Sequence, residues 1–253
     1  MGGGCYGGRM STVEACEAAQ TCWFSCRAAA LGGQTWTDGP LHWIREGAEQ
    51  NLMFPTRIPA DAVQSAVEEA RETGVQIIGA WLGTEVDASA LAAAGFERGW
   101  APSWMAAPVA DVGVSDDPRV ELQEESNDYS DEYADYAEML KLTRVRPQHT
   151  WYAAAYVEPG KAASRKLAGP RFAGRAWSHL TGETAGVFDM NVWPRFQRRG
   201  IGSGLLRAVV AAAAQAGARD AVLNATTEGR LLYETCGFRQ IGAGITWWLH
   251  LEA

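Results

Sequence analysis

The pattern of apolar runs and polar breaks along the chain predicts a repeated order of helices and strands. Residues 11–33 are expected to form a helix that Ser11 or Thr12 caps, with Glu14 in its first turn and Gly32-Gly33 at its end. A second helix is expected over 59–74, where Pro59 stands at the start and Gly74 is the stop. Between them, residues 34–47 and 51–58 predict short strands around turns.

The same reading of the rest of the chain gives alternating strands and helices. Strands are expected over 75–83, 96–109, 119–125, 150–160, 171–192 (as a strand-turn-strand), 220–226 and 238–251. Helices are expected over 87–95, 130–144, 200–217 and 229–237. The stretch 111–118, "DVGVSDDP", is typical of a loop and is the best candidate for a domain boundary.

Two passages, 75–105 and 220–248, repeat one order of elements: strand, loop, short helix, Gly-Phe and a strand that carries Trp. Long helices precede both passages at matching places, and such repetition decides the architecture. We therefore predict an α/β (α+β) fold of two lobes, 11–112 and 113–253, each with a mixed, mostly antiparallel sheet flanked by helices. The first ten residues, "MGGGCYGGRM", are expected to form a flexible leader.

Composition and charge narrow the range of possible functions. The 253 residues are 47 % hydrophobic, which suits a globular protein, and no apolar run approaches the ~18 residues of a membrane span. The net charge of -8 argues against nucleic acid and anionic membranes as partners and is compatible with a cationic amine.

The five cysteines, an odd number without framework spacing, predict reduced thiols in a cytoplasmic protein. Cys22 and Cys26 are four residues apart, which places them on one face of a helix. That spacing could hold a metal, but no second Cys or His pair accompanies it, so we interpret both as structural and expect no metal site.

The most informative stretch is "VWPRFQRRGIG" at 192–202, which runs directly into an almost uncharged helix. A diphosphate needs backbone N–H groups, close approach and positive charge, and a glycine loop entering a helix provides the first two. Gly200 and Gly202 leave room there, while Arg198 and Arg199 supply charge. The glycine spacing alone fits an ordinary basic surface loop equally well.

The surrounding residues resemble, position for position, the signature of the GNAT superfamily of acyl-coenzyme A-dependent N-acyltransferases. That loop reads Gln/Arg-x-x-Gly-x-Gly/Ala in the family, as residues 197–202 do here, and "LLYETCGF" at 231–238 is similar to the family's Leu-Tyr-x-x-x-Gly-Phe. The resemblance covers about 120–250. Residues 11–110 resemble a degenerate lobe, since Gly95-Phe96 remains but the glycine loop is missing.

The resemblance implies roles for the residues that match. The strand before the loop would be splayed at a bulge, with the amide of Met190 facing the thioester carbonyl and Val192 pairing with the pantetheine arm. Tyr233 would protonate the departing thiolate. Thr226 stands where the family often has an Asn that contacts the coenzyme, and Asn224 lies two residues earlier. The implied coenzyme-binding residues are Met190, Asn191, Val192, Gln197, Arg198, Arg199, Gly200, Ile201, Gly202, Ser203 and Thr226.

The general base is left open by the sequence. Asp189 precedes the carbonyl-binding position, and strand alternation places it on one face with Asn191. Glu158, Glu183, His179 or a chain of water molecules are the alternatives. The tryptophans could line an acceptor pocket, although large aromatics more often pack where two lobes meet; the candidates are Trp36, Trp43, Trp151 and Trp177.

The resemblance implies a tandem GNAT-like N-acetyltransferase that moves acetyl from acetyl-coenzyme A to a primary amine of a small molecule by direct attack. The N-terminal lobe would form part of the acceptor pocket without a donor site of its own. Two alternatives remain: a coenzyme-binding sensor or carrier without transfer activity, and an acyltransferase whose donor is a carrier protein or an aminoacyl-tRNA.

Overall fold

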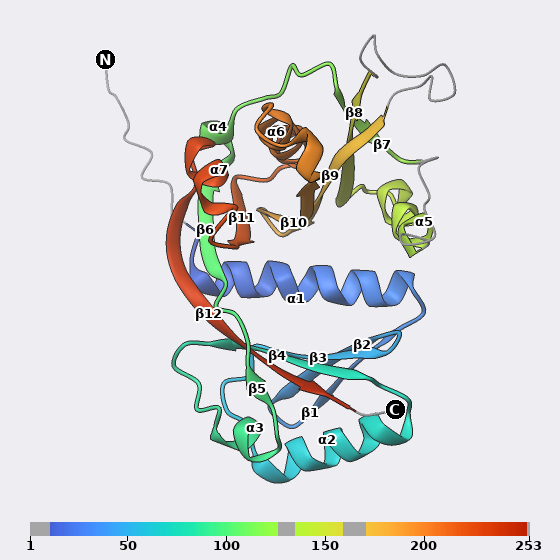
Figure 1. Ribbon diagram of the computed structural model, residues 1–253, viewed down its shortest axis with the longest axis vertical. Coiled ribbons are helices and arrows are strands. Elements are labelled where there is room, and N and C mark those ends of the chain that lie inside the picture. Colours follow the sequence, from blue (N-terminus) through green and yellow to red (C-terminus); the bar gives the residue numbers. More distant parts are fainter. Residues whose placement is uncertain (1–10, 126–134, 159–170, 252–253) are drawn as a thin grey trace.

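Two layered lobes lie on either side of one long helix in the computed structural model, which describes residues 11–125, 135–158 and 171–251 (Figure 1). The expected leader, 1–10, lies outside the described residues. The N-terminal half contains α1 (Val13–Ala30), β1 (Gln34–Asp38), β2 (Leu41–Glu46), β3 (Glu49–Met53), α2 (Ala60–Glu72), β4 (Ile77–Gly83), α3 (Ser89–Ala93), β5 (Glu97–Arg98), β6 (Ser103–Pro108) and α4 (Val109–Val112).

The C-terminal half follows the same plan. It contains β7 (Val120–Gln123), α5 (Asp135–Met139), the 3₁₀ helix η2 (Leu140–Arg144), β8 (Thr150–Val157), β9 (Arg171–Thr181), β10 (Thr184–Val192), the 3₁₀ helix η4 (Pro194–Phe196), α6 (Ile201–Gln215), β11 (Asp220–Ala225), α7 (Arg230–Thr235) and β12 (Arg239–His250). The first part of the helix expected over 130–144 lies outside the described residues.

The two halves share one connectivity, as the internal repeat predicts. In the first, β2 and β3 form an antiparallel hairpin and α2 leads from β3 to the parallel strand β4. In the second, β9 and β10 form the hairpin and α6 leads to the parallel strand β11. The predicted fold class, two lobes with mixed, mostly antiparallel sheets and helices on their faces, is confirmed.

The last strand of each half completes the sheet of the other half. Strand β6 pairs along its whole length with β11 of the C-terminal lobe. Strand β12 begins beside β6 and then passes to β4, with Gly244 opposite Gly83 and His250 opposite Ile77. Figure 1 shows β12 as one long strand that runs from one lobe into the other. The lobes are therefore joined by backbone hydrogen bonds as well as by side chains.

The prediction of one closing strand over 96–109 is wrong in the extent of that strand. It is divided into β5 and β6, and the following residues form the short helix α4. Pro102 lies in the interruption, and a proline has no N–H to donate to a continuous ladder.

Helix α1 packs against both lobes at once. The Thr12 side chain accepts a hydrogen bond from the amide of Ala15 at 3.4 Å, which confirms the expected cap. Trp23 stacks on Phe188 of β10 at a centroid distance of 5.2 Å, whereas Phe24 meets Trp81 of β4 at 5.7 Å. Neighbouring side chains of α1 thus enter different lobes, so the helix is covered on two faces.

The tryptophans considered for a pocket belong mostly to the core. Trp43, Trp151 and Trp177 are buried, and Trp36 stacks on Trp43 at 6.4 Å. The interpretation as packing residues is confirmed for the three buried ones.

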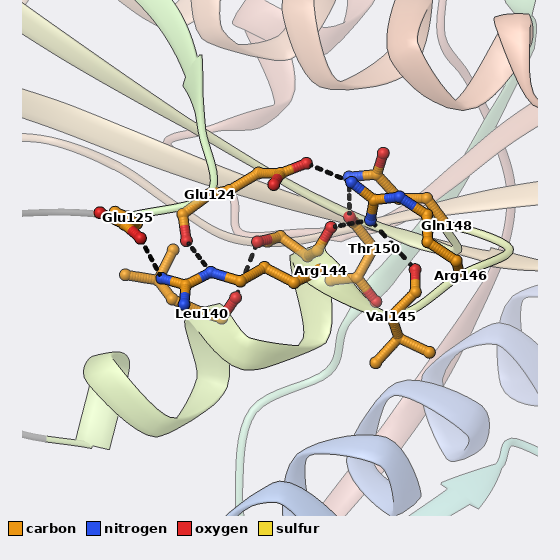
Figure 2. Close-up of polar contacts among 9 residues, drawn as sticks. Glu124, Glu125, Leu140, Arg144, Val145, Arg146, Gln148 and Thr150 are labelled. Atoms are coloured by element: carbon orange, nitrogen blue, oxygen red, sulfur yellow. Dashed lines mark hydrogen bonds and ion pairs between the residues drawn. The ribbon is translucent and has the colours of Figure 1, made fainter.

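A polar network holds the turn before β8 in place (Figure 2). Arg146 donates to the Glu124 carboxylate at 2.7 Å, and Arg144 donates to the Glu124 carbonyl at 3.1 Å. The Gln148 amide donates to the carbonyl of Thr150 at 3.0 Å. These contacts set the start of β8, where the Thr150 side chain enters the interior. Within the described residues, every helix is too short or too polar to cross a bilayer.

Candidate functional site

The C-terminal lobe opens between two parallel strands. β10 and β11 pair from Thr184–Asp220 to Gly186–Val222, and beyond these residues β10 stays with β9 while β11 stays with β6. The corresponding strands of the N-terminal lobe, β3 and β4, pair over the whole of β3, and the amide of Phe54 still donates to the Trp81 carbonyl at 2.8 Å. One edge of β10 is therefore left unpaired in the C-terminal lobe, whereas β4 covers the corresponding edge of β3 in the N-terminal lobe.

The unpaired part of β10 contains a bulge, which confirms the distortion that the resemblance implies. The register with β9 passes from Phe188–Trp177 to Asn191–Arg175, so Asp189 and Met190 together face one residue of β9. Asp189 has a φ of 46°, a conformation that non-glycine residues rarely adopt. Such strain, held in place by the surrounding sheet, is frequent where backbone groups are aimed at a ligand.

The basic glycine loop follows β10 and is held at both ends. The Gln197 side chain donates to the Val192 carbonyl at 2.9 Å, which ties the loop to the strand before it. Arg119 donates to the Arg199 carbonyl at 2.9 Å, and Asp117 holds that guanidinium at 2.7 Å. Arg198 and Arg199 keep their side chains exposed.

Glycine is required at two positions of this loop for different reasons. Gly200 caps α6 with a φ of 80°, a left-handed conformation that suits glycine. Gly202 is instead buried in the first turn of α6, and a Cβ there would lie 3.0 Å from Cδ1 of Leu232 on α7. A bulky side chain at position 202 would therefore press on α7.

Tyr233 lies on α7 and is 8 % exposed. Its ring packs against Phe238 at a centroid distance of 6.1 Å. Burial, with a smaller contribution from Cys236, raises the pKa of Tyr233 to about 12, so the phenol is neutral and keeps its proton near pH 7.

The structure brings most of the predicted residues to one place. Tyr233 shares a hydrophobic cluster with Ile201 of α6, and side chains from the bulged end of β10 and from α7 pack on it: Met190, Val192 and Leu232. Strand β10, the glycine loop and α7 thus surround the end of the opened strand pair.

The side chains of Thr226 and Asn224 have different surroundings. Thr226 is exposed, and its hydroxyl accepts a hydrogen bond from the amide of Gly229 at 3.2 Å, just before α7. The Asn224 side chain donates to Gln20 of α1 at 2.6 Å. Asn224 is therefore engaged with α1.

Among the candidate bases, Asp189 lies in the bulge itself. Its carboxylate is 3.9 Å from Nη1 of Arg27 on α1, and the same guanidinium binds Glu46 of β2 at 2.7 Å. Glu183 pairs with Arg219 at 3.0 Å on the surface, and Glu158 is exposed at the end of β8. His179 is buried beside the thiols of α1.

Sequence reasoning missed an acidic depression of about 610 Å³ at the C-terminal end of α1. Residues of α1, of the β2–β3 turn and of α5 line it, and three of them are carboxylates: Glu46, Glu49 and Glu138. Glu46 connects it through Arg27 to Asp189. These carboxylates come from segments far apart in the sequence, so no local motif reveals them.

Part of the C-terminal lobe is similar to a known protein family. Residues 161–240 match the family model described as the acetyltransferase (GNAT) domain. Residues 161–240 are therefore similar to a GNAT acetyltransferase domain. The recognition based on the glycine loop and the Leu-Tyr segment is thereby confirmed.

Solved structures show the same fold over nearly the whole chain. A GCN5-related N-acetyltransferase from Kribbella flavida has a TM-score of 0.58 at 15 % identity, over 93 % of this chain and 96 % of that one. A tandem GNAT protein from the clavulanic acid biosynthesis pathway has a TM-score of 0.54 at 14 % identity, over 84 % of this chain and 79 % of that one. A functionally unknown conserved protein from Staphylococcus epidermidis reaches 0.56 at 14 % identity, over 88 % and 96 %. No curated protein sequence matches the chain.

Proposed function

We propose that this protein is a tandem GNAT N-acetyltransferase, which transfers acetyl from acetyl-coenzyme A to a primary amine of a small molecule. The opening between β10 and β11 carries the proposal, because it lies in the lobe that also has the glycine loop and Tyr233. The N-terminal lobe has the same connectivity but closed strands and no glycine loop. It is therefore a degenerate copy.

The donor would bind along the backbone. The first N–H groups of α6 have no partner within the helix, and the helix dipole favours an anion there. The residues from Gln197 to Ser203 would hold the diphosphate, with the exposed Arg198 and Arg199 adding charge. The free edge of β10 at Asn191 and Val192 offers the pantetheine arm a strand to pair with.

The transfer would use the Met190 amide and Tyr233 of this chain, with Asp189 or water as the base. The amine nitrogen forms a bond to the acetyl carbon as the bond from that carbon to sulfur breaks. The Met190 amide donates to the carbonyl oxygen as it gains negative charge. Tyr233 gives its proton to the departing sulfur, and the proton lost by the amine goes to Asp189 or to water.

The acidic depression supports an amine as the acceptor substrate. The depression beside α1 carries Glu46, Glu49 and Glu138, which would attract a cation. Glu46 of this depression binds Arg27, whose guanidinium also lies 3.9 Å from the carboxylate of Asp189, so α1 and the N-terminal lobe would contribute to acceptor binding.

The proposal is tested by measuring thiol release from acetyl-coenzyme A with a panel of small amines. The double variant Arg198→Ser/Arg199→Ser should weaken donor binding about tenfold or more in calorimetry, since two cations near the diphosphate are lost. Arg219→Ser is the matched control, because Arg219 is exposed beyond the opposite end of α6. Tight donor binding without thiol release for any amine would point to a sensor, and the absence of donor binding would refute the proposal.

A further inference from the structure

Outside the donor site, two cysteines and a histidine meet at the contact between α1 and the C-terminal lobe. Cys22 and Cys26 are one turn apart on α1 and are half-buried. Nε2 of His179, on β9, lies 3.4 Å from Sγ of Cys22 and 3.6 Å from Sγ of Cys26. The three atoms lie within 4.8 Å of one another. The sequence offers no partner for the cysteine pair, but the fold supplies one from 157 residues away.

The spacing of these atoms matches the edges of a metal tetrahedron. Zinc binds thiolate sulfur at about 2.3 Å and imidazole nitrogen at about 2.0–2.1 Å, so tetrahedral geometry puts the sulfur and nitrogen atoms about 3.6 Å apart. The two sulfur–nitrogen distances here are 3.4 and 3.6 Å. An ion would therefore fit among the three atoms with little movement.

The histidine is oriented as a ligand. Its Nδ1 lies 2.9 Å from the hydroxyl of Thr150, and both residues are buried. A hydrogen bond donated from Nδ1 to that hydroxyl leaves the lone pair of Nε2 toward the two sulfurs. Thr150 itself begins β8, at the end of the network that fixes the preceding turn (Figure 2).

We propose that Cys22, Cys26 and His179 bind one Zn²⁺ ion, which joins α1 of the N-terminal half to β9 of the C-terminal lobe. Binding releases the thiol protons, so that two thiolates and a neutral imidazole balance the charge of the ion. The buried hydroxyl of Thr181 lies beside Cys22 and would bind a water molecule in the fourth position.

The ion would set the position of the part of α1 that faces the bulge of β10. Arg27 follows Cys26 directly and lies 3.9 Å from Asp189. Zinc at this site would act through position, since its three ligands lie on α1 and β9, whereas Tyr233 lies on α7 and the glycine loop precedes α6. Metal content and ligand spectra therefore test the site independently of acetyl transfer.

The experiment measures bound metal by elemental mass spectrometry in the full chain, purified from cells that were grown with added zinc. We expect about one equivalent in the wild type and at least about a tenfold loss in Cys22→Ala, Cys26→Ala and His179→Ala. Cys16→Ala is the matched control, because Cys16 is buried on the same helix outside the cluster, and it should keep the metal. Thr150→Val removes the hydroxyl that orients the ring and should weaken zinc binding by about 10–100-fold.

Cobalt gives a second measurement that needs no variant to fold. Titration of the metal-free wild type with Co²⁺ should produce a thiolate-to-cobalt charge-transfer band and the strong visible bands of a tetrahedral site. A wild type that takes up neither zinc nor cobalt at stoichiometric levels would overturn the proposal. So would retention of the metal by folded Cys22→Ala and His179→Ala, which would place it elsewhere.

Discussion

The change Tyr233→Phe separates chemistry from packing at the donor site. The ring is 8 % exposed and packs on Phe238, so the phenylalanine should keep these contacts and the fold. Positioned general acids contribute about 10²–10⁴-fold to a rate. The pKa of Tyr233 is raised to about 12, which is well above the ~8.5 of a thiol, so the proton transfer is uphill and the lower end applies. We expect turnover to fall about 100-fold.

The assay compares thiol release with donor affinity. Single-turnover rates and calorimetry with acetyl-coenzyme A should show a slower transfer and a dissociation constant within about twofold of wild type, the pattern of an interaction made in the transition state. Tyr156→Phe is a control for loss of a tyrosine hydroxyl, because Tyr156 bonds Gln123 on β7. If Tyr233→Phe keeps more than about half of the turnover while chemistry limits the rate, Tyr233 does not act as the acid.

The raised pKa also predicts how stability depends on pH. A tyrosine is half-ionised near pH 10 when unfolded, whereas folded Tyr233 keeps its proton to about pH 12. The contribution of Tyr233 is therefore complete below about pH 10 and is lost between about pH 10 and 12, at about 1.4 kcal/mol per pH unit. Denaturant unfolding at rising pH should show this loss in the wild type and a smaller one in Tyr233→Phe. Equal slopes would mean that the phenol is not buried as described.

Further expectations concern the stoichiometry, the base and the glycine loop. Calorimetry should find one coenzyme A per chain, and two comparable sites would contradict a degenerate N-terminal lobe. Asp189→Asn should lower turnover by about 10²-fold with little change in donor affinity, and an unchanged rate would assign the proton to water. Gly202→Val should cost about 1–3 kcal/mol of stability and weaken donor binding, because its side chain would meet Leu232. A folded Gly202→Val protein with wild-type stability and donor affinity would contradict this prediction, because it would show that α7 accommodates the larger side chain.

The elements that the sequence predicts well are those with local signals. Thr12 caps α1, and Gly74 ends α2 with a φ of 75°, as the residue types indicate. The exchange of strands has no such signal. Strand β6 looks like the closing strand of its own lobe, because its apolar residues would suit either sheet. Which neighbour it pairs with depends on the whole sheet, and a single interruption at Pro102 does not reveal it.

The candidate site likewise has parts with a local sequence signal and parts that depend on tertiary packing. The glycine loop and the Leu-Tyr segment are each contiguous in the sequence, so residue type and spacing are enough to recognise both segments. The contact of Asp189 with Arg27 and the meeting of His179 with the α1 cysteines join residues from opposite ends of the chain. Only the packing of α1 between the lobes brings them together, and periodicity does not encode that placement.

The strand exchange explains why a lobe without a donor loop would be retained. Strand β6 is the neighbour of β11, and α1 covers the face that carries Phe188 and Trp177. Without the N-terminal half, β11 would expose an unpaired edge and β10 would lose the helix that carries Arg27. In the other direction, β12 completes the sheet beside β4. Each half is thus a structural part of the other, and this holds whether or not the N-terminal half binds a donor of its own.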